Sequence, residues 1–247
     1  MAIKAFVIHL ERAAGRRLQV ERLLATLPIG GEVLPAVDGL QMTSDEIAGV
    51  CRSHLHRPHY PFPLTRTEVA CFLSHRRAWQ AIVDGGLDAG LVVEDDAAIV
   101  EPGFGEVLTA AVEGLGPDEL VRFPHRERHE PGPVVRTRGG ARLMEPRLPA
   151  LGMVMQLVGR EAARRLLDAS RCFDRPVDSF VQMQWLHGAR ILSARPIVVR
   201  EICGELGGSV IHPPRAGFVH KVVHEINRPL IRIAMRRANE RWRRKAA

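Results

Sequence analysis

The stretch AGLVVEDDAAIV, residues 89–100, places Glu94, Asp95 and Asp96 directly after a continuous apolar run. A short apolar run of this kind predicts a strand that is buried on both faces, as in a parallel sheet covered by helices. In such sheets ligands bind beyond the carboxyl ends of the strands. Carboxylates gathered there suit a hard divalent cation, which offsets their mutual repulsion. The alternative explanation for these three carboxylates is a solvated acidic turn after the strand.

Strand and helix patterns alternate on both sides of this stretch. Strands are expected at 5–10, 31–39 and 118–124, in the first part of 153–170, and at 189–199; helices are expected at 16–27, 65–84, in the second part of 153–170, and from Pro176–Asp178 onward. Leu18, Leu23, Leu24 and Leu27 are spaced as one helical face, and Thr43 with Glu46 and Thr65 with Glu68 form capping-box patterns. The alternation predicts an α/β fold with a mostly parallel sheet flanked by helices.

The length of 247 residues and the apolar content of 46% allow one large α/β domain. No apolar run approaches the ~20 residues that cross a bilayer, and the N-terminus lacks a signal-peptide pattern, so a cytoplasmic location is expected. A Pro- and Gly-containing linker near 213 divides the chain into a body, 1–212, and a tail, 213–247. The polar segment 125–147 is expected to form a loop or hairpin that contributes to substrate choice.

Positive charge is concentrated in the tail. Of the 35 Lys and Arg and 28 Asp and Glu residues, nine basic and two acidic ones lie in 220–247, which leaves 26 of each sign elsewhere. Val219, Val223, Ile226, Leu230 and Ile233 are spaced as one helical stripe. A basic amphipathic helix suits an anionic membrane surface; the alternative is a stripe packed on the body with only 236–245 solvated. The neutral body and single Tyr disfavour nucleic acid as a partner.

Four cysteines are scattered without CxxC pairing, which predicts reduced core residues and not a disulfide framework or a zinc site: Cys51, Cys71, Cys172 and Cys203. No P-loop or GxGxxG motif follows any strand. Enzymes that bind nucleoside triphosphates or dinucleotides through those motifs are therefore disfavoured.

Four ordered motifs resemble glycosyltransferase family 25, the group of lipopolysaccharide-biosynthesis and collagen-galactosyltransferase proteins. They are VIHLERAAGR (7–16), AVDG (36–39), a helix with Thr65, Glu68, Cys71, Ser74, His75 and Trp79, and VVEDD (92–96). A looser Gly- and Leu-containing pattern from Gly152 to Leu167 extends the match. The chain departs from the family pattern at His9, Val93 and Met155, where Asn, Leu and a nearby Tyr are usual.

The resemblance implies a GT-A-like, Rossmann-type fold and a sugar nucleotide held at the end of the first strand, near Leu10. Arg12 and Arg16 follow that strand, where guanidinium groups meet phosphates; the alternative is that both are solvated residues at a helix start. Asp38 is a candidate for base or ribose binding, although an Asp-Gly turn explains it equally well. His75 is expected to position the donor or another site residue and not to take part in the chemistry.

The resemblance also implies a divalent metal, Mn²⁺ or Mg²⁺, at the acidic motif. Asp96 is then the direct ligand, and Glu94 contacts the metal or the ribose. Asp95 orients the other two acids or binds hydroxyls of the donor sugar. His212 is the positional choice for a third ligand. As a lone His beside Pro-Pro, however, it is equally consistent with an exposed residue.

An inverting transferase needs a general base that accepts the proton of the acceptor hydroxyl. Asp178, at a helix start late in the fold, is the candidate, and Glu205 is its rival. The alternative for Asp178 is an N-cap of the helix beginning at Ser179.

The function expected from these features is inverting, metal-dependent transfer of a hexose, galactose being the first choice. The donor is a UDP-sugar, the acceptor is a saccharide or lipid-linked saccharide, and the process is cell-envelope glycan synthesis. The location is the cytoplasm or the inner face of the cytoplasmic membrane. Alternatives are a nucleotidyltransferase, a non-catalytic homologue, or a protein that binds an anionic partner through its basic tail. The segment HLERAAG lacks the glycine-rich loop usual in nucleotidyltransferases.

Overall fold

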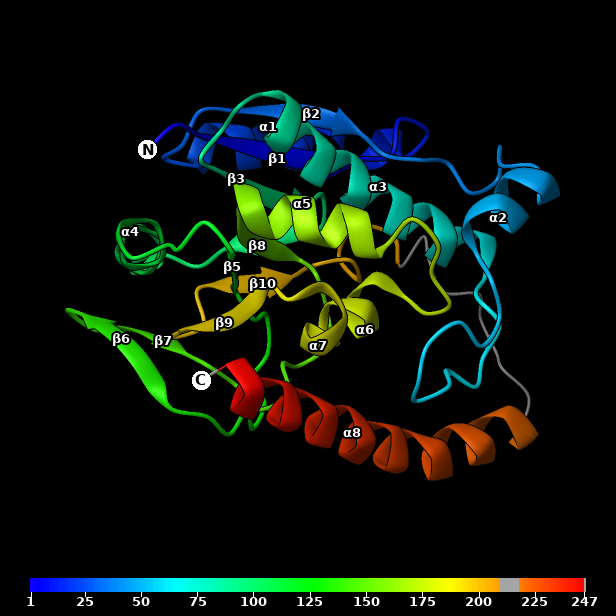
Figure 1. The fold of residues 1–247 in the computed structure, drawn as a ribbon. Coiled ribbons are helices and arrows are strands. Elements are labelled where there is room, and N and C mark those ends of the chain that lie inside the picture. Colours follow the sequence, from blue (N-terminus) through cyan, green and yellow to red (C-terminus); the bar gives the residue numbers. More distant parts are fainter. Residues whose placement is uncertain (209–217, 247) are drawn as a thin grey trace.

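The computed structural model describes residues 1–208 and 218–246, and this part is built around one large sheet (Figure 1). The strand order in that sheet is β2-β1-β3-β8-β5-β9-β7-β6. The bounds are β1 Ile3–His9, β2 Gly31–Pro35, β3 Ala89–Glu94, β5 Glu119–Arg122, β6 Val134–Arg138, β7 Ala141–Met144, β8 Met155–Gly159 and β9 Arg190–Arg195. A separate antiparallel pair joins β4 (Ala97–Ile99) to β10 (Val199–Glu201).

Helices cover both faces of the sheet. Successive side chains of β1 alternate between two cores, with Ala5 and Val7 in one and Phe6 and Ile8 in the other. The first core includes helices α1 and α4, and the second includes α3, α5 and α6. The helical bounds are η1 Ala14–Arg16, α1 Arg17–Thr26, α2 Ser44–Val50, α3 Arg66–Asp84, α4 Phe104–Glu113, α5 Arg160–Ala169, α6 Val177–Val181, α7 Gln184–His187 and α8 Phe218–Ala246.

The predicted α/β class with a mostly parallel sheet is confirmed. The strands β2, β1, β3, β5, β9 and β6 run in one direction, whereas β8 and β7 run in the other. The strand expected at 189–199 is in fact two strands, because the chain leaves the large sheet after β9 and pairs β10 with β4. This departure brings the end of β10 close to the acidic motif.

Helix α3 positions one wall of the site because its start and its packing are both well defined. Thr65 accepts a hydrogen bond from the Glu68 N–H, and the Glu68 carboxylate accepts one from the Thr65 N–H, which confirms the predicted capping box. Thr43 and Glu46 form the second predicted box, on α2. At Gly90 of β3 an added Cβ would lie 2.4 Å from an Ile82 side-chain carbon, so glycine permits the close approach of α3 to the strand.

Two other local predictions had different outcomes. Leu18 is 67% exposed, so the predicted Leu face of α1 is wrong at this position, and Val20 and Leu23 supply the buried contacts. The polar segment 125–147 contains the antiparallel strands β6 and β7, which confirms a hairpin.

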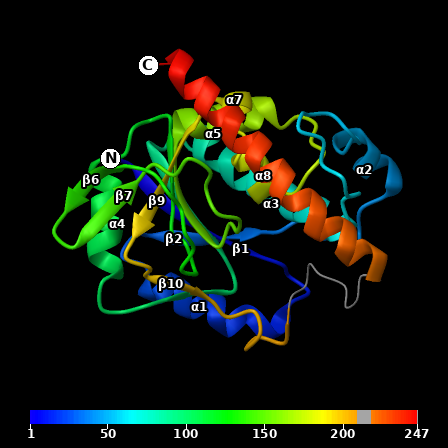
Figure 2. The same ribbon diagram turned by 90° about the horizontal axis from the view of Figure 1, so that it is seen from below.

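The tail forms a long helix, α8, which runs along the body beside α7 (Figures 1 and 2). Met235 and Asn239 are buried in this contact, whereas Leu230 and Ile233 are 62% and 49% exposed. The alternative of a fully solvated 236–245 end is therefore wrong, because Asn239 bonds to residues at the start of α7. The other side chains of the stripe and the expected boundary at 212–213 lie outside the described residues. No described helix is long and apolar enough to span a membrane.

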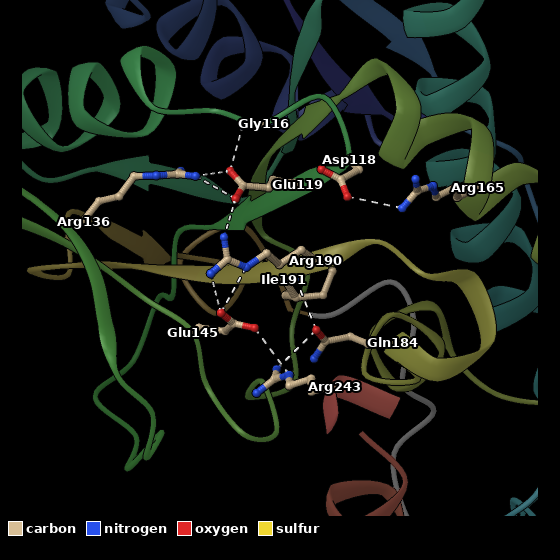
Figure 3. A network of polar contacts seen from close by, with 10 residues as sticks. All are labelled: Gly116, Asp118, Glu119, Arg136, Glu145, Arg165, Gln184, Arg190, Ile191 and Arg243. Atoms are coloured by element: carbon tan, nitrogen blue, oxygen red, sulfur yellow. Dashed lines mark hydrogen bonds and ion pairs between the residues drawn. The ribbon is translucent and has the colours of Figure 1, made fainter. Parts of the chain in front are cut away.

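A polar network connects the hairpin, the centre of the sheet and α8 (Figure 3). Arg190 of β9 bonds to Glu119 at 3.0 Å and to Glu145 at 2.5 Å. Arg136 of β6 also bonds to Glu119, and Arg243 of α8 lies 3.4 Å from Glu145. Glu119 and Glu145 each pair with two guanidinium groups, so each carboxylate keeps one partner when a single arginine is removed. The network fixes α8 to the body through side chains from three separate segments.

Buried His187 is expected to make the fold sensitive to acid. Burial lowers its pKa to about 4, although its hydrogen bond to the Val181 carbonyl acts in the opposite direction. The unfolded chain binds this proton near pH 6.5 and the folded one does not. Stability is therefore fully present above pH 6.5 and is lost as the pH falls toward 4, by about 3 kcal/mol.

Urea unfolding of the wild type and His187→Gln at pH 7 and pH 4.5 measures this effect. The difference in unfolding free energy between the two pH values should be smaller in the variant, because carboxylate contributions are common to both proteins. An equal pH dependence in both proteins would show that His187 is not the acid-sensitive group.

Candidate functional site

A pocket opens beyond the carboxyl ends of β1 and β3, where the sequence predicted a site. Its lining includes most of the predicted site residues: Leu10, Arg12, Arg16, His75, Glu94, Asp95 and Asp96. Ile8, Ala36, Val37 and Ala70 form an apolar part of the same lining. The acids come from the end of β3, the arginines follow β1, and His75 projects from α3. The pocket thus combines an apolar wall with charges of both signs.

Asp95 and Arg16 form the buried centre of this arrangement. Arg16 Nη1 donates to Asp95 Oδ1 at 2.5 Å, and His9 Nδ1 lies 2.8 Å from Asp95 Oδ2. Arg16 is only 6% exposed, so the alternative of a solvated residue is wrong for it. Its Nη2 also donates to the Gly208 carbonyl at 2.9 Å. Asp95 therefore connects β1 and the segment after it to the acidic motif, and its predicted roles toward the other acids or the donor sugar stay predictions.

Asp96 has an oxygen that lacks a partner. Arg16 Nη1 lies 3.4 Å from Oδ2, whereas Oδ1 is buried and has no hydrogen-bond partner among the described residues. Burial, together with the charge of Glu94, raises the pKa of Asp96 to about 7, against the opposing effect of Arg16. A buried carboxylate oxygen with no donor is costly unless a cation satisfies it. Asp96 thus fits the direct metal ligand predicted from the sequence.

Glu94 is held in place by a chain of buried side chains. His75 is 1% exposed, and its Nε2 lies 3.0 Å from Glu94 Oε1. Gln156 Nε2, which also lies 3.3 Å from the Met153 carbonyl, is 3.2 Å from His75 Nδ1. Because the amide nitrogen is a donor, Nδ1 accepts and the His75 proton lies on Nε2, directed at Glu94. This arrangement agrees with a positioning role for His75.

Arg12 and Asp38 form a more exposed pair at the pocket mouth. Arg12 Nε donates to Asp38 Oδ2 at 2.9 Å, and the Arg12 side chain is 41% exposed. Asp38 Oδ1 accepts the Leu40 N–H at 3.0 Å, which is the turn contact expected of an Asp-Gly segment. The turn explanation of Asp38 is therefore supported by a contact, and Asp38 also holds Arg12 in place, whereas base or ribose binding stays a prediction. Arg12 keeps exposed N–H groups with which to meet an anion.

Asp178 and Glu205 lie outside this pocket lining. Asp178 is near enough to Glu94 for that charge to affect it; burial raises its pKa, and hydrogen bonds from the Ser179 and Gly152 N–H groups oppose the rise. It lies in the first turn of α6, which begins at Val177 and not at Ser179. Glu205 is exposed and lies 3.8 Å from Arg200. His212 falls outside the described residues.

Sequence reasoning missed several residues at the rim. Ligand atoms of Asp96, Glu201 and Cys203 all lie within 4.8 Å of one another. The expectation that the four cysteines are core residues is wrong in that all four are partly exposed, and Cys203 lies beside this site. His125, from the loop after β5, lies 3.2 Å from Glu201. No spacing signal relates positions so distant in the chain, and only the pairing of β10 with β4 brings them together.

Sequence comparison identifies the class to which this arrangement belongs. The described part has an α/β fold, with an acidic motif at the end of a central strand. The profile of glycosyltransferase family 25 (LPS biosynthesis protein) matches residues 2–135, which is more than half of the chain. The chain belongs to glycosyltransferase family 25, as its motifs predicted.

Similar proteins include procollagen galactosyltransferase 1 of Danio rerio, 36% identical over 96 residues, which are 38% of this chain and 16% of that protein. Procollagen galactosyltransferase 2 of Homo sapiens is 29% identical over 191 residues, 73% of this chain and 30% of that protein. The probable inactive glycosyltransferase 25 family member 3 of Bos taurus is 30% identical over 220 residues, 79% of this chain and 36% of that protein. The aligned part of this chain covers between 16% and 36% of the length of these relatives.

Among solved structures, a glycosyltransferase involved in the glycosylation of the major capsid of PBCV-1 resembles this fold with a TM-score of 0.44 and 10% sequence identity. The match covers 83% of this chain and 94% of that one.

Proposed function

We propose that this protein is an inverting, metal-dependent glycosyltransferase that moves a hexose from a UDP-sugar to a saccharide acceptor in cell-envelope glycan synthesis. The observation that carries the proposal is the unpartnered, buried Oδ1 of Asp96 in a pocket that also presents Glu94 and Arg12. Family membership supports sugar transfer, and relatives named as galactosyltransferases favour galactose as the hexose.

The pocket residues divide into three roles. Asp96, together with Glu94, would hold a divalent cation, Mn²⁺ or Mg²⁺, which when bound neutralises charge on the diphosphate leaving group. Arg12 supplies exposed N–H donors to a phosphate. Leu10 and Val37 offer an apolar surface to the base. Asp95, paired with Arg16, keeps the acidic motif in register with β1.

Calorimetry with UDP, in the presence and absence of MnCl₂, tests the proposal. The expected result is UDP binding that requires the metal, followed by metal-dependent hydrolysis of one UDP-sugar in a screen of several sugars. Equal binding of UDP with and without metal, or no binding in either case, would contradict it. Arg12→Gln is a useful companion variant: it should weaken UDP binding while leaving stability within about 1 kcal/mol, because its ion pair is exposed.

Asp178→Asn is expected to reduce kcat for transfer by about 10²- to 10⁴-fold, because Asp178 is the proposed general base. The dissociation constant for UDP should stay unchanged, since Asp178 does not line the nucleotide pocket. Steady-state kinetics with a saccharide acceptor and calorimetry with UDP measure the two quantities. Glu205→Gln is the matched control, because Glu205 is an exposed carboxylate with only a long contact to Arg200. Unchanged kcat in Asp178→Asn would remove it as the base.

The exposed face of α8 supports peripheral binding to an anionic membrane, where a lipid-linked acceptor would be reached from the inner side. Leu230 and Ile233 are exposed there, as are Arg237, Arg241 and Arg244. Apolar residues beside arginines match the chemistry of an anionic lipid surface.

Replacing Arg237, Arg241 and Arg244 together with Gln should abolish binding to vesicles that contain anionic lipid at low salt. Each removed charge contributes about 1 kcal/mol near such a surface. Vesicle co-sedimentation measures the effect, and vesicles of neutral lipid serve as the control. Binding by the triple variant equal to that of the wild type would contradict this membrane role.

A further inference from the structure

The small β4–β10 sheet places two potential ligands beside Asp96. Glu201 at the end of β10 lies opposite Ala97, and the Ile202 N–H donates to the Asp96 carbonyl at 2.8 Å. These backbone bonds set the position of Cys203, which follows directly. One carboxylate oxygen of Asp96, one of Glu201 and the Cys203 Sγ consequently lie within 4.8 Å of one another. Metal–ligand bonds of about 2.0–2.3 Å would require only a modest side-chain closure of such a group.

The Glu201 carboxylate is held by two basic side chains and also hydrogen-bonds to the Cys203 thiol. His125 Nε2 and Arg126 Nη2 both approach Oε2, at 3.2 Å and 2.5 Å, so neither of them occupies Oε1. A carboxylate held from behind by a His and an Arg is oriented in the way that metal-ligating carboxylates usually are. Together with the unpartnered Oδ1 of Asp96, Glu201 therefore presents oxygen toward the space that Cys203 borders.

A second group in the pocket, Cys71, His75 and Glu94, also has ligand atoms within 4.8 Å of one another. Here the donors are already used, because His75 bonds to Glu94 through one ring nitrogen and to Gln156 through the other. The group around Asp96 is the better site for a cation.

We propose that Glu201 and Cys203 complete the divalent-cation site of Asp96, adding one carboxylate and one thiolate to the ligands Asp96 and Glu94 of the proposed function. The Cys203 thiol releases its proton to solvent when the ion binds. A sulfur ligand shifts preference from Mg²⁺ toward thiophilic ions such as Co²⁺ and Zn²⁺. The inference rests on the proposed function only in that Asp96 binds a metal.

Cobalt substitution tests this ligand set without any activity assay, because a thiolate–Co²⁺ bond produces a charge-transfer band in the near ultraviolet. Titration of the full chain with CoCl₂ should give this band in the wild type, in Cys172→Ser and in Cys71→Ser. The band should disappear in Cys203→Ser. Calorimetry should show Co²⁺ affinity reduced about tenfold or more in Glu201→Gln and in Asp96→Asn.

Cys203→Asp is the control for a loss of folding. This variant should still bind Co²⁺, but without the charge-transfer band. Co²⁺ binding without a thiolate band, or a band that is lost only in Cys71→Ser, would overturn the assignment of Cys203 and leave the proposed metal-dependent transfer standing. Affinity for Co²⁺ unchanged in Glu201→Gln would likewise remove Glu201. Wild-type affinity in Asp96→Asn would overturn both this inference and the metal site of the proposed function.

Discussion

Asp96→Asn is expected to lower metal-dependent hydrolysis of the donor by at least about 10³-fold, while the metal-free protein stays as stable as the wild type or becomes more stable. The two effects have one cause. Ionised Asp96 is buried beside Glu94, which raises its pKa to about 7, so its charge opposes folding at neutral pH when no cation is bound. The variant removes the charge together with the ligand.

Two measurements separate ligand loss from damage to the fold. Thermal unfolding of the metal-free proteins should give an equal or higher Tm for the variant, and added Mn²⁺ should raise Tm only in the wild type. Glu106→Gln is a matched control, since this carboxylate lies away from the pocket and bonds to the Gly140 N–H. A large drop in Tm for Asp96→Asn would show that Asp96 acts as a structural residue, and retained hydrolysis would exclude it as the ligand.

Arg16→Gln is expected to reduce the free energy of unfolding by about 3–5 kcal/mol, a large share of the ~5–15 kcal/mol typical of a domain. Arg16 is the cation that Asp95 and Asp96 share, and it also donates to the Gly208 carbonyl. Without it, Asp95 keeps only His9 as a side-chain partner in a nearly solvent-free position. Urea unfolding measures the loss.

A double-mutant cycle with Asp95→Asn distinguishes an unpaired charge from a simple packing defect. Arg16→Gln with Asp95→Asn should lose less stability than the two single losses combined, because the carboxylate of Asp95 is then no longer buried opposite a missing cation. Strict additivity would indicate that the two side chains act independently. The exposed Arg12–Asp38 pair is the comparison, since breaking it should change stability by no more than about 1 kcal/mol.

Local features of the chain were predictable because they depend on neighbours in sequence. The capping boxes at Thr43 and Thr65 need only a hydroxyl and a carboxylate three residues apart. The apolar run before Glu94 marks a buried central strand by composition alone. The ordered family motifs then placed the pocket at the ends of β1 and β3, where the structure has it.

Contacts between distant segments were not predictable in the same way. The antiparallel insertion of β8 between β3 and β5 puts Gln156 beside His75, although neither residue has a local pattern that signals the other. On α8, the spacing of Leu230 and Ile233 predicted one apolar stripe, either for a membrane surface or for packing on the body. The helix instead buries Met235 and Asn239, and Asn239 bonds to the Gln182 carbonyl and to the Gln184 N–H.

The sequence by itself determined the α/β class, the family, and the acidic strand end with Asp96 as its candidate ligand, since these depend on periodicity and on short motifs. Only the tertiary structure decided how the three acids differ: Asp95 pairs with Arg16 and hydrogen-bonds to His9, Glu94 is held by His75, and Asp96 keeps an oxygen without a partner among the described residues. The physical reason is that a carboxylate's role depends on which charges and donors surround it, and here those groups come from positions up to 86 residues away.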